Sequence, residues 1–187
     1  MVCGMALLAV SCTTVLPPLI SFARFSPSVD QGFQLKTNTA VVYGRFTTGA
    51  DFAFGNELAV RLRNDEAKRE YLIRCRDKDA VSAIAVEPGR YRIAGFVATF
   101  VDRRTAGRRN FPNSPSFEVP PNAVTYVGDI SGQAKITALG QQWRITGITN
   151  NFVQTTVEFR SKYPHLAEAT LVSVYEPQAV SSRSVVR

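Results

Sequence analysis

The chain has few of the side chains that catalysis and metal binding most often use. Its 187 residues include one histidine and three cysteines. No glycine-rich loop ends in Gly-Lys-Ser/Thr, and no Gly-x-Ser-x-Gly elbow occurs. The sequence therefore offers neither a phosphate loop nor a hydrolase nucleophile of those types. We predict a protein that is not an enzyme and that holds no metal and no cofactor.

The amino-terminal stretch also lacks an apolar run long enough to cross a membrane, which takes about 20 residues. Residues 5–10 form a short apolar run, and Pro17 and Pro18 interrupt the apolar character that resumes at Val15. A short apolar run, a small residue and then Cys12 is the order of a signal peptide followed by its cleavage region.

The residues Ala9, Val10 and Ser11 before Cys12 resemble the lipobox of bacterial lipoproteins. Small side chains there let a signal peptidase approach the backbone, and the Cys12 thiol can take a diacylglyceryl group. The stretch departs from the family in two ways, because a branched apolar residue is usual where Ala9 stands and no basic residue precedes the apolar run. The resemblance implies a lipid anchor on Cys12. An uncleaved apolar terminus and a plain signal peptide are the alternatives.

The same resemblance implies a location and a division of the chain. Thr13 follows the cysteine, where aspartate is the usual signal for retention in the inner membrane, so we expect the periplasmic face of the outer membrane. We predict a signal peptide over residues 1–11 and a lipidated, flexible tether over residues 12–37. A β-sandwich domain over residues 38–170 and a tail over residues 171–187 follow.

The cysteines are too few for a disulfide framework. If residues 1–11 are removed and Cys12 is acylated, Cys75 has no partner, which excludes a disulfide-framed secreted fold by counting. Cys75 shares one face of an alternating segment with Tyr71 and Ile73. We therefore interpret it as an inert core thiol.

Beyond the tether, apolar and polar residues alternate, with turn signals roughly every ten residues. Leu58, Val60 and Leu62 face one way, and Arg61 and Arg63 face the other, which is typical of a half-solvated antiparallel strand. We predict an all-β fold, an antiparallel β-sandwich of about seven to eight strands with one C-terminal helix. The side chains expected to point inward are Val41, Leu58, Val60, Ile73, Ile93 and Val127.

The helix candidate covers residues 151–163, with Asn150 or Asn151 as its cap and Pro164 at its end. Its helical stripe consists of Phe152, Thr156, Phe159 and Tyr163. Two threonines and two valines weaken the helical pattern, so a strand is the alternative. Elsewhere, Pro88-Gly89 predicts a type II turn, and Ser131-Gly132 predicts a turn between two strands.

Three segments of the predicted sandwich resemble a known family. They are Pro88-Gly89-Arg90-Tyr91, Phe117-Glu118-Val119 and Tyr126-Val127-Gly128. The set resembles the PGxY hairpin, FxV strand and YxG strand of transthyretin-like or carboxypeptidase-regulatory-like domains in bacterial lipoproteins. The resemblance covers residues 38–132 and implies a small sandwich without an active site of its own.

Positive charge is concentrated in one part of the chain. The formal net charge is +7, and residues 90–109 hold six arginines and one acidic residue. We predict an anion-binding loop with Arg103, Arg104, Arg108 and Arg109, because guanidinium groups bind phosphates and carboxylates in pairs of hydrogen bonds. A solvated loop without a ligand is the alternative. Anionic lipid, lipopolysaccharide, peptidoglycan or an envelope protein are the expected partners, and nucleic acid is not, because stacking aromatics are not interleaved with the arginines.

Together these features predict a membrane-anchored, non-enzymatic interaction or structural module of the bacterial envelope. The alternative is an envelope enzyme or a metal-dependent sugar-binding protein whose site combines scattered acidic residues such as Glu118 and Asp129. A Cys75–His165 dyad has no support from neighbouring residues, and His165 follows the helix end, where the helix dipole favours a basic residue.

The lipobox resemblance leads to the first testable prediction. Replacing Cys12 with serine should abolish labelling by an alkyne fatty acid and release the protein from the membrane fraction, because the acylated thiol is lost. The sandwich should still fold in this variant, since Cys12 precedes the first expected strand by many residues. An unlabelled parent protein, expressed in its own host, would contradict the prediction.

Overall fold

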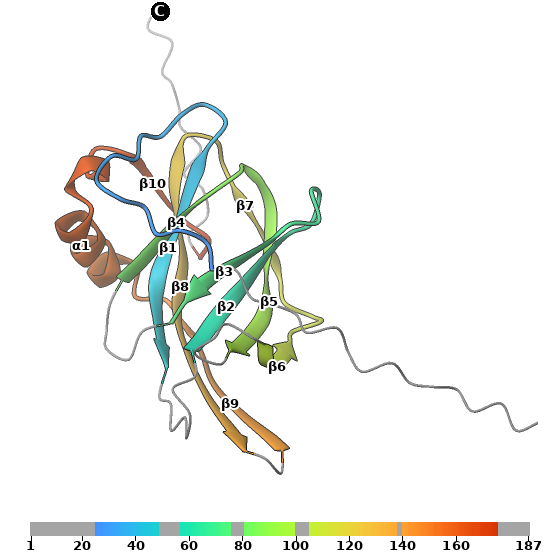
Figure 1. Cartoon of the computed structure of the whole chain (residues 1–187). Helices are drawn as coiled ribbons and strands as arrows, with labels where there is room; N and C mark the ends of the chain where they lie inside the picture. Colours follow the sequence, from blue (N-terminus) through green and yellow to red (C-terminus); the bar gives the residue numbers. More distant parts are fainter. Residues whose placement is uncertain (1–24, 49–56, 76–80, 100–104, 138–139, 176–187) are drawn as a thin grey trace, which may run out of the picture.

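The computed structural model describes residues 25–48, 57–75, 81–99, 105–137 and 140–175. The described residues form ten strands, one α-helix and one short 3₁₀ helix, and the strands lie in two five-stranded sheets packed face to face (Figure 1). The predicted all-β sandwich with a C-terminal helix is confirmed. Cys12, Arg103 and Arg104 lie outside the described residues.

We call the two layers the helix sheet and the open sheet. The helix sheet contains β1 (Ala40–Thr48), β4 (Val81–Val86), β8 (Ala123–Thr137), β9 (Gly140–Thr149) and β10 (Thr170–Ser173). The open sheet contains β2 (Glu57–Asn64), β3 (Glu70–Arg74), β5 (Gly89–Thr99), β6 (Thr105–Asn110) and β7 (Ser116–Val119). Most neighbouring strands are antiparallel, but β8 pairs in parallel with both β1 and β10. The predicted boundary between sandwich and tail, at residue 170, falls at the start of β10.

The core between the sheets contains five of the six side chains predicted to point inward. Leu58, Val60, Ile73, Ile93 and Val127 are all buried there. Val41 is buried as well, but on the opposite side of the helix sheet, in a second cluster. Its orientation was wrongly predicted because alternation alone cannot tell which of two buried faces looks toward the other sheet.

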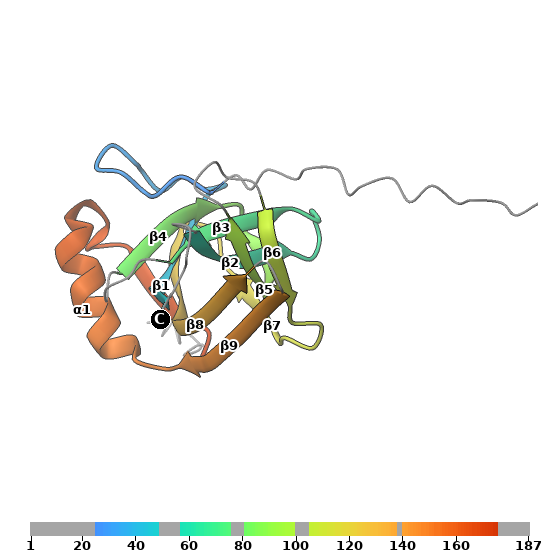
Figure 2. The same ribbon diagram turned by 60° about the horizontal axis from the view of Figure 1, so that its bottom comes forward.

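The second cluster exists because a helix covers the outer face of the helix sheet. The helix α1 (Phe152–Lys162) and the 3₁₀ helix η1 (Pro164–Leu166) lie on this face (Figure 2), so the helical reading of residues 151–163 is confirmed and the strand reading is wrong. The rings of Phe159 and Tyr43 are 4.3 Å apart between centroids. Burial of both faces explains why β1 is apolar on both sides.

Two glycine bulges set which side chains face the core. In β5, the pairing with β2 shifts by one residue beside Gly95, which has a φ of 139°. In β8, the pairing with β1 shifts beside Gly128, which has a φ of 111°. Each bulge adds one residue, so Ile93 and Phe96 both point inward although three positions separate them. Positive φ values of this size favour glycine.

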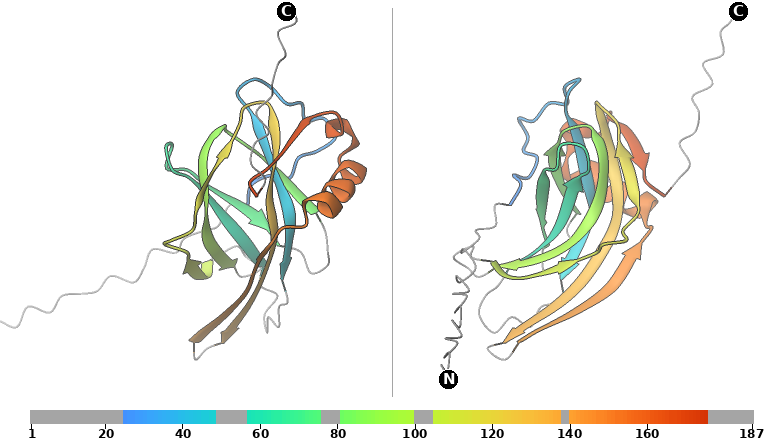
Figure 3. Two further views of the ribbon diagram at one scale, coloured as in Figure 1. Left: turned by 180° about the vertical axis from the view of Figure 1, so that it is seen from behind. Right: turned by 90° about the vertical axis from the view of Figure 1, so that its right-hand side faces the viewer.

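The two predicted turns have different outcomes. At Pro88-Gly89 the glycine has a positive φ, 141°, as the turn prediction requires. The chain changes sheets there between β4 and β5, so the hairpin implied by the family resemblance does not form. Ser131-Gly132 lies inside β8, which runs on to Thr137 and continues with β9 beyond the other strands (Figure 3). A Cβ on residue 132 would lie 3.0 Å from Cζ of Phe96, so this glycine makes room for a core ring and does not turn the chain.

Residues 25–37, expected to be part of a flexible tether, lie against the sandwich. Phe25 packs on the outer face of the open sheet, the Ser26 amide donates to the carbonyl of Leu72 in β3, and Ser28 bridges to Ile84 in β4. Val29 is buried on the outer side of the helix sheet. We call residues 25–37 the strap. It covers two edge strands, which would otherwise present unpaired backbone groups.

The described residues contain no helix that is both long and apolar enough to cross a membrane.

The bulge in β5 gives the second prediction. A Cβ on residue 95 would lie 1.9 Å from the backbone oxygen of Arg109 in β6, and the backbone cannot yield as a side chain can. Gly95→Ala should therefore lower the free energy of unfolding by more than about 3 kcal/mol, the upper range for backbone strain alone. Urea denaturation measures the loss.

Gly147→Ala is the matched control for that variant. Gly147 also has a positive φ, 117°, but a Cβ there would meet nothing within 4 Å. Its substitution should cost only about 1–3 kcal/mol, the cost of strain without a clash. Equal losses in the two variants would contradict the steric argument.

Candidate functional site

The structure describes two of the four arginines of the predicted anion-binding loop, and both lie in strand β6. Arg108 and Arg109 are exposed. Arg108 points to the outer face of the open sheet, where its Nη1 lies 4.0 Å from Oε2 of Glu70 in β3. The described half of the predicted loop is therefore part of an edge strand, and Arg108 joins a set of charged side chains on the sheet.

This outer face holds a cleft that the sequence did not predict. It has a volume of about 360 Å³. Three arginines from the two central strands line it, together with the end of β6 and the two residues that follow. The lining residues are Arg61, Arg63, Arg92, Ala94, Asn110, Phe111 and Pro112. We call this the arginine cleft.

Arg61 is the fixed element of the arginine cleft. Only 8% of its side chain is exposed. Its Nη1 donates to Oδ1 of Asn110 at 2.6 Å, and its Nη2 donates to Oε1 of Glu70 at 2.5 Å. A buried guanidinium is costly unless it is paired, and these two partners from β6 and β3 hold it in one orientation.

Arg92 and Arg63 are paired to different extents. Nε of Arg92 lies 3.1 Å from Oδ1 of Asp65, close enough for an ion pair, but its N–H is not aimed at that oxygen. Arg63 faces Arg92 directly across the β2–β5 pairing. Among the described residues, no group forms a hydrogen bond or ion pair with the guanidinium of Arg63.

The three arginines share one further property. The Nε–H groups of Arg61, Arg63 and Arg92 are buried and have no hydrogen-bond acceptor in the described part of the chain. Buried donors normally have partners, because leaving one unsatisfied costs about 1–3 kcal/mol. Arg45 and Arg74 also have a buried Nε–H of this kind, so this property does not single out the cleft. The arginine cleft is suited to an oxyanion because three guanidinium groups line one cavity.

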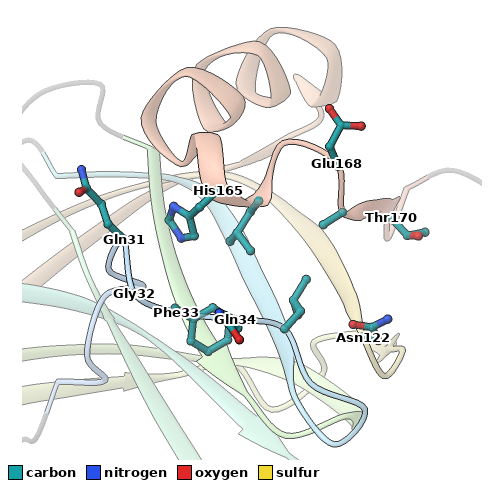
Figure 4. A pocket seen from close by; sticks show the side chains of 11 residues that line it. Gln31, Gly32, Phe33, Gln34, Asn122, His165, Glu168 and Thr170 are labelled. Atoms are coloured by element: carbon teal, nitrogen blue, oxygen red, sulfur yellow. The ribbon is translucent and has the colours of Figure 1, made fainter.

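A second, larger groove lies beside His165. It has a volume of about 510 Å³ and runs between the strap and the segment from η1 to β10. Figure 4 shows His165 reaching toward Gln31 and Phe33 of the strap, whereas Glu168 points the other way. The His165 ring touches that of Tyr163 edge-on, with the centroids 6.3 Å apart. No acid or thiol stands beside His165 to pair with it in the described residues.

The structure keeps the other candidate groups apart. Cys75 is buried between the two sheets, whereas His165 lies on the outer side of the helix sheet, so they form no dyad. Glu118 lies on the outer face of the open sheet and Asp129 on the outer face of the helix sheet. The described residues contain no group of three potential metal ligands.

Asp129 is buried for a structural reason. Its carboxylate accepts hydrogen bonds from Thr155 Oγ1 at 2.9 Å and from Asn151 Nδ2 at 3.0 Å, and the Tyr126 hydroxyl lies 3.1 Å away. These contacts join β8 to the start of α1. Burial raises the pKa of Tyr126 to about 12, so its hydroxyl stays a donor at neutral pH.

The signal for the arginine cleft was present in the sequence but incomplete. The alternation of Arg61 and Arg63 with Leu62 placed both arginines on the solvent face, as observed. Their neighbour Arg92 lies 29 positions after Arg63 in the chain. Only the pairing of β2 with β5 brings these side chains together, and the sequence did not specify that pairing.

Comparison with known proteins does not assign the chain to a family. No model of a known protein family matches the chain, and no curated protein matches it. A solved structure described as "Trapped Toxin" aligns with 59% of this chain and 23% of its own, at 10% sequence identity and a TM-score of 0.16. Similarity at that level carries no argument about fold or function. The likeness to transthyretin-like sandwiches stays a prediction.

The burial of Cys75 gives a prediction about reactivity. Burial raises the pKa of this thiol from 9.0 to about 12, so the nucleophilic thiolate is almost absent in the folded protein. Iodoacetamide at pH 8 should leave Cys75 unmodified in the native protein and modify it after unfolding in urea. Peptide mass spectrometry resolves this cysteine from the others. Rapid native alkylation would contradict the buried position.

The raised pKa of Cys75 also predicts how the stability of the fold depends on pH. Folding favours the neutral thiol, so its contribution to stability is complete below the unfolded pKa of about 9 and is lost as the pH rises toward 12. The urea midpoint should fall across this range. Cys75→Ala should show a shallower fall, and the part that remains comes from buried tyrosines such as Tyr126, whose pKa is also raised.

Proposed function

We propose that the protein is a non-enzymatic module of the bacterial envelope that attaches to an anionic surface at two points. One point is a lipid on Cys12, and the other is the outer face of the open sheet. The observation that carries the proposal is the position of Phe25. It packs on the same face that holds the arginine cleft.

The position of Phe25 links the anchor to this face. The guanidinium carbon of Arg74 lies 4.6 Å from the centre of the Phe25 ring, a cation–π contact on the outer face. Phe25 is thirteen positions after Cys12. A chain of that length spans at most about 47 Å. An anchored Cys12 would therefore keep Phe25 within about 47 Å of the membrane surface.

The charge of this face favours an anionic surface. Six arginines lie on it, against four acidic residues that pair with or neighbour them. The arginines are Arg61, Arg63, Arg74, Arg90, Arg92 and Arg108, and the acidic residues are Glu57, Asp65, Glu70 and Glu118. Arg90 and Arg108 are exposed. Each basic residue near an anionic membrane contributes about 1 kcal/mol to binding.

The lipid and the arginine face would contribute differently to attachment. A diacylglyceryl group carries two acyl chains and is a durable anchor by itself, and a basic surface adds a further contribution that favours one orientation of the domain. An arginine-rich face on the same side as the anchor can contribute without any rearrangement of the sandwich. The nearby polyanions in the predicted location are lipid headgroups, lipopolysaccharide and peptidoglycan, all of which carry phosphate or carboxylate groups.

Vesicle binding tests the contribution of the arginine face. The protein with Cys12→Ser, which has no acyl chain, should bind vesicles that contain phosphatidylglycerol and should release them at high salt. Adding Arg90→Ser and Arg108→Ser should weaken binding about 30-fold, from two lost contributions of about 1 kcal/mol each. Cosedimentation at several salt concentrations measures both effects.

A charge-matched control uses exposed basic residues elsewhere. Lys36 lies in the strap and Arg160 lies on α1, and both are exposed. Lys36→Ser with Arg160→Ser removes the same charge and should leave binding close to that of the parent. Equal weakening by the two double variants would show that net charge alone drives binding, and the arginine face would then have no special role.

A further inference from the structure

We infer that the arginine cleft is a binding site for one phosphate monoester group, held between Arg61, Arg63 and Arg92. The inference deepens the proposed function and rests on it, because the same face supplies the contact surface. It goes further in one respect. A charged face attracts any polyanion, whereas a cleft with fixed donors selects a particular chemical group.

The donors come from a rigid part of the fold. Arg61 and Arg63 lie on β2 and Arg92 lies on β5, which are adjacent central strands of the open sheet. Asn110 and Glu70 fix the Arg61 guanidinium, and Asp65 lies beside Arg92. Two of the three cations are thus oriented before a ligand arrives, so little ordering is required when it binds.

A ligand would supply the anionic partner that Arg63 lacks among the described residues. Arg61 and Arg92 have carboxylate partners, but Arg63 has none among the residues that the structure describes. Arg108 lies on the same face, 4.0 Å from Glu70, and the excess positive charge around the cleft suits a group of charge near −2, as a phosphate monoester has. Three arginines also match three terminal phosphate oxygens, whereas a carboxylate needs only one arginine.

The volume of the cleft indicates what the phosphate carries. A cavity of about 360 Å³ is at the lower end of small-molecule sites and is much larger than a bare phosphate. Phe111 and Pro112 complete the lining of the cleft. The Phe111 ring itself packs edge-on against Phe96 of the core between the sheets, with the centroids 5.6 Å apart. The cleft therefore fits a phosphate with an organic substituent. A lipid headgroup and a soluble phosphate ester share this chemistry.

The test uses the full chain with Cys12→Ser and inorganic phosphate as the probe, followed by isothermal titration calorimetry. The parent should bind phosphate saturably, and Arg63→Gln should weaken binding at least about tenfold, the loss expected for one charge-assisted contact. Arg63→Lys should also weaken it, because an ammonium cannot reproduce the two parallel hydrogen bonds of a guanidinium. The Arg63 guanidinium has no partner to lose in the part of the chain that the structure describes, so both variants should fold, as circular dichroism can verify.

Arg69→Gln is the matched control. Arg69 lies directly before β3 of the same sheet, has a side chain that is 63% exposed and does not line the cleft. Its substitution should leave the phosphate affinity within about twofold of the parent, which is within ordinary surface effects. Equal losses in Arg63→Gln and Arg69→Gln would overturn the inference, because net charge, and not a built site, would then hold the phosphate.

Vesicles separate the two sources of the phosphate and the two proposals. If Arg63→Gln reduces binding to phosphatidic acid, a monoester, more than to phosphatidylglycerol, a diester, the bound group is a lipid headgroup. Phosphate binding with no such preference assigns a soluble ester. A parent that binds anionic vesicles but not phosphate overturns the cleft and leaves the proposed function intact. A parent that binds phosphate but no anionic vesicle overturns the proposed function and leaves the phosphate site intact.

Discussion

The buried carboxylate of Asp129 is the interaction on which the helix side of the sandwich depends. It receives hydrogen bonds from β8, from the residue that caps α1 and from α1 itself. An unpaired buried carboxylate would cost several kcal/mol. The packing of α1 and its capping residue against β8 is therefore needed to keep Asp129 satisfied in its buried position. The bulge at Gly128 sets this meeting, because it turns Tyr126 and Asp129 to the same face although three positions separate them.

The open sheet has a buried charge of the opposite sign, with a different outcome. The side chains of Asp129 and Arg61 are exposed to nearly the same extent, 9% and 8%. Asp129 is surrounded by donors from its own chain, and Arg61 is held by Asn110 and Glu70, whereas the guanidinium of Arg63 beside it has no partner among the described residues. A satisfied buried charge rigidifies a fold, and a guanidinium without a partner can pair with a ligand. This difference separates the structural side of the molecule from the side that we assign to binding.

The sequence predicted those features that depend on local periodicity. Alternation placed Leu58 and Val60 inside and Arg61 outside, and the helical stripe through Phe159 identified α1. Prediction from periodicity failed at three glycines. Gly95 and Gly128 lie at bulges that add one residue to a strand, and Gly132 makes room for the ring of Phe96, which is distant in the chain. The arginine cleft could not be predicted for a related reason. Its walls come from strands that are adjacent in space and far apart in the chain. The dense arginine run instead pointed to β6 and to residues outside the described part.

The two kinds of arginine on the open sheet act over different distances. Arg90 and Arg108 are exposed, so their attraction to an anionic surface fades beyond the Debye length, about 8 Å in physiological salt. Arg61 lies in a cleft where salt screens it less, but it acts only on a group that enters. In the proposed function, the exposed arginines would therefore favour approach and orientation, and the cleft would select which group is held after contact. The proposed lipid on Cys12 would keep Phe25 of the same face within about 47 Å of that surface. Attachment that combines a short-range selective contact with a screened long-range one stays selective at physiological salt, when the long-range attraction is weakest.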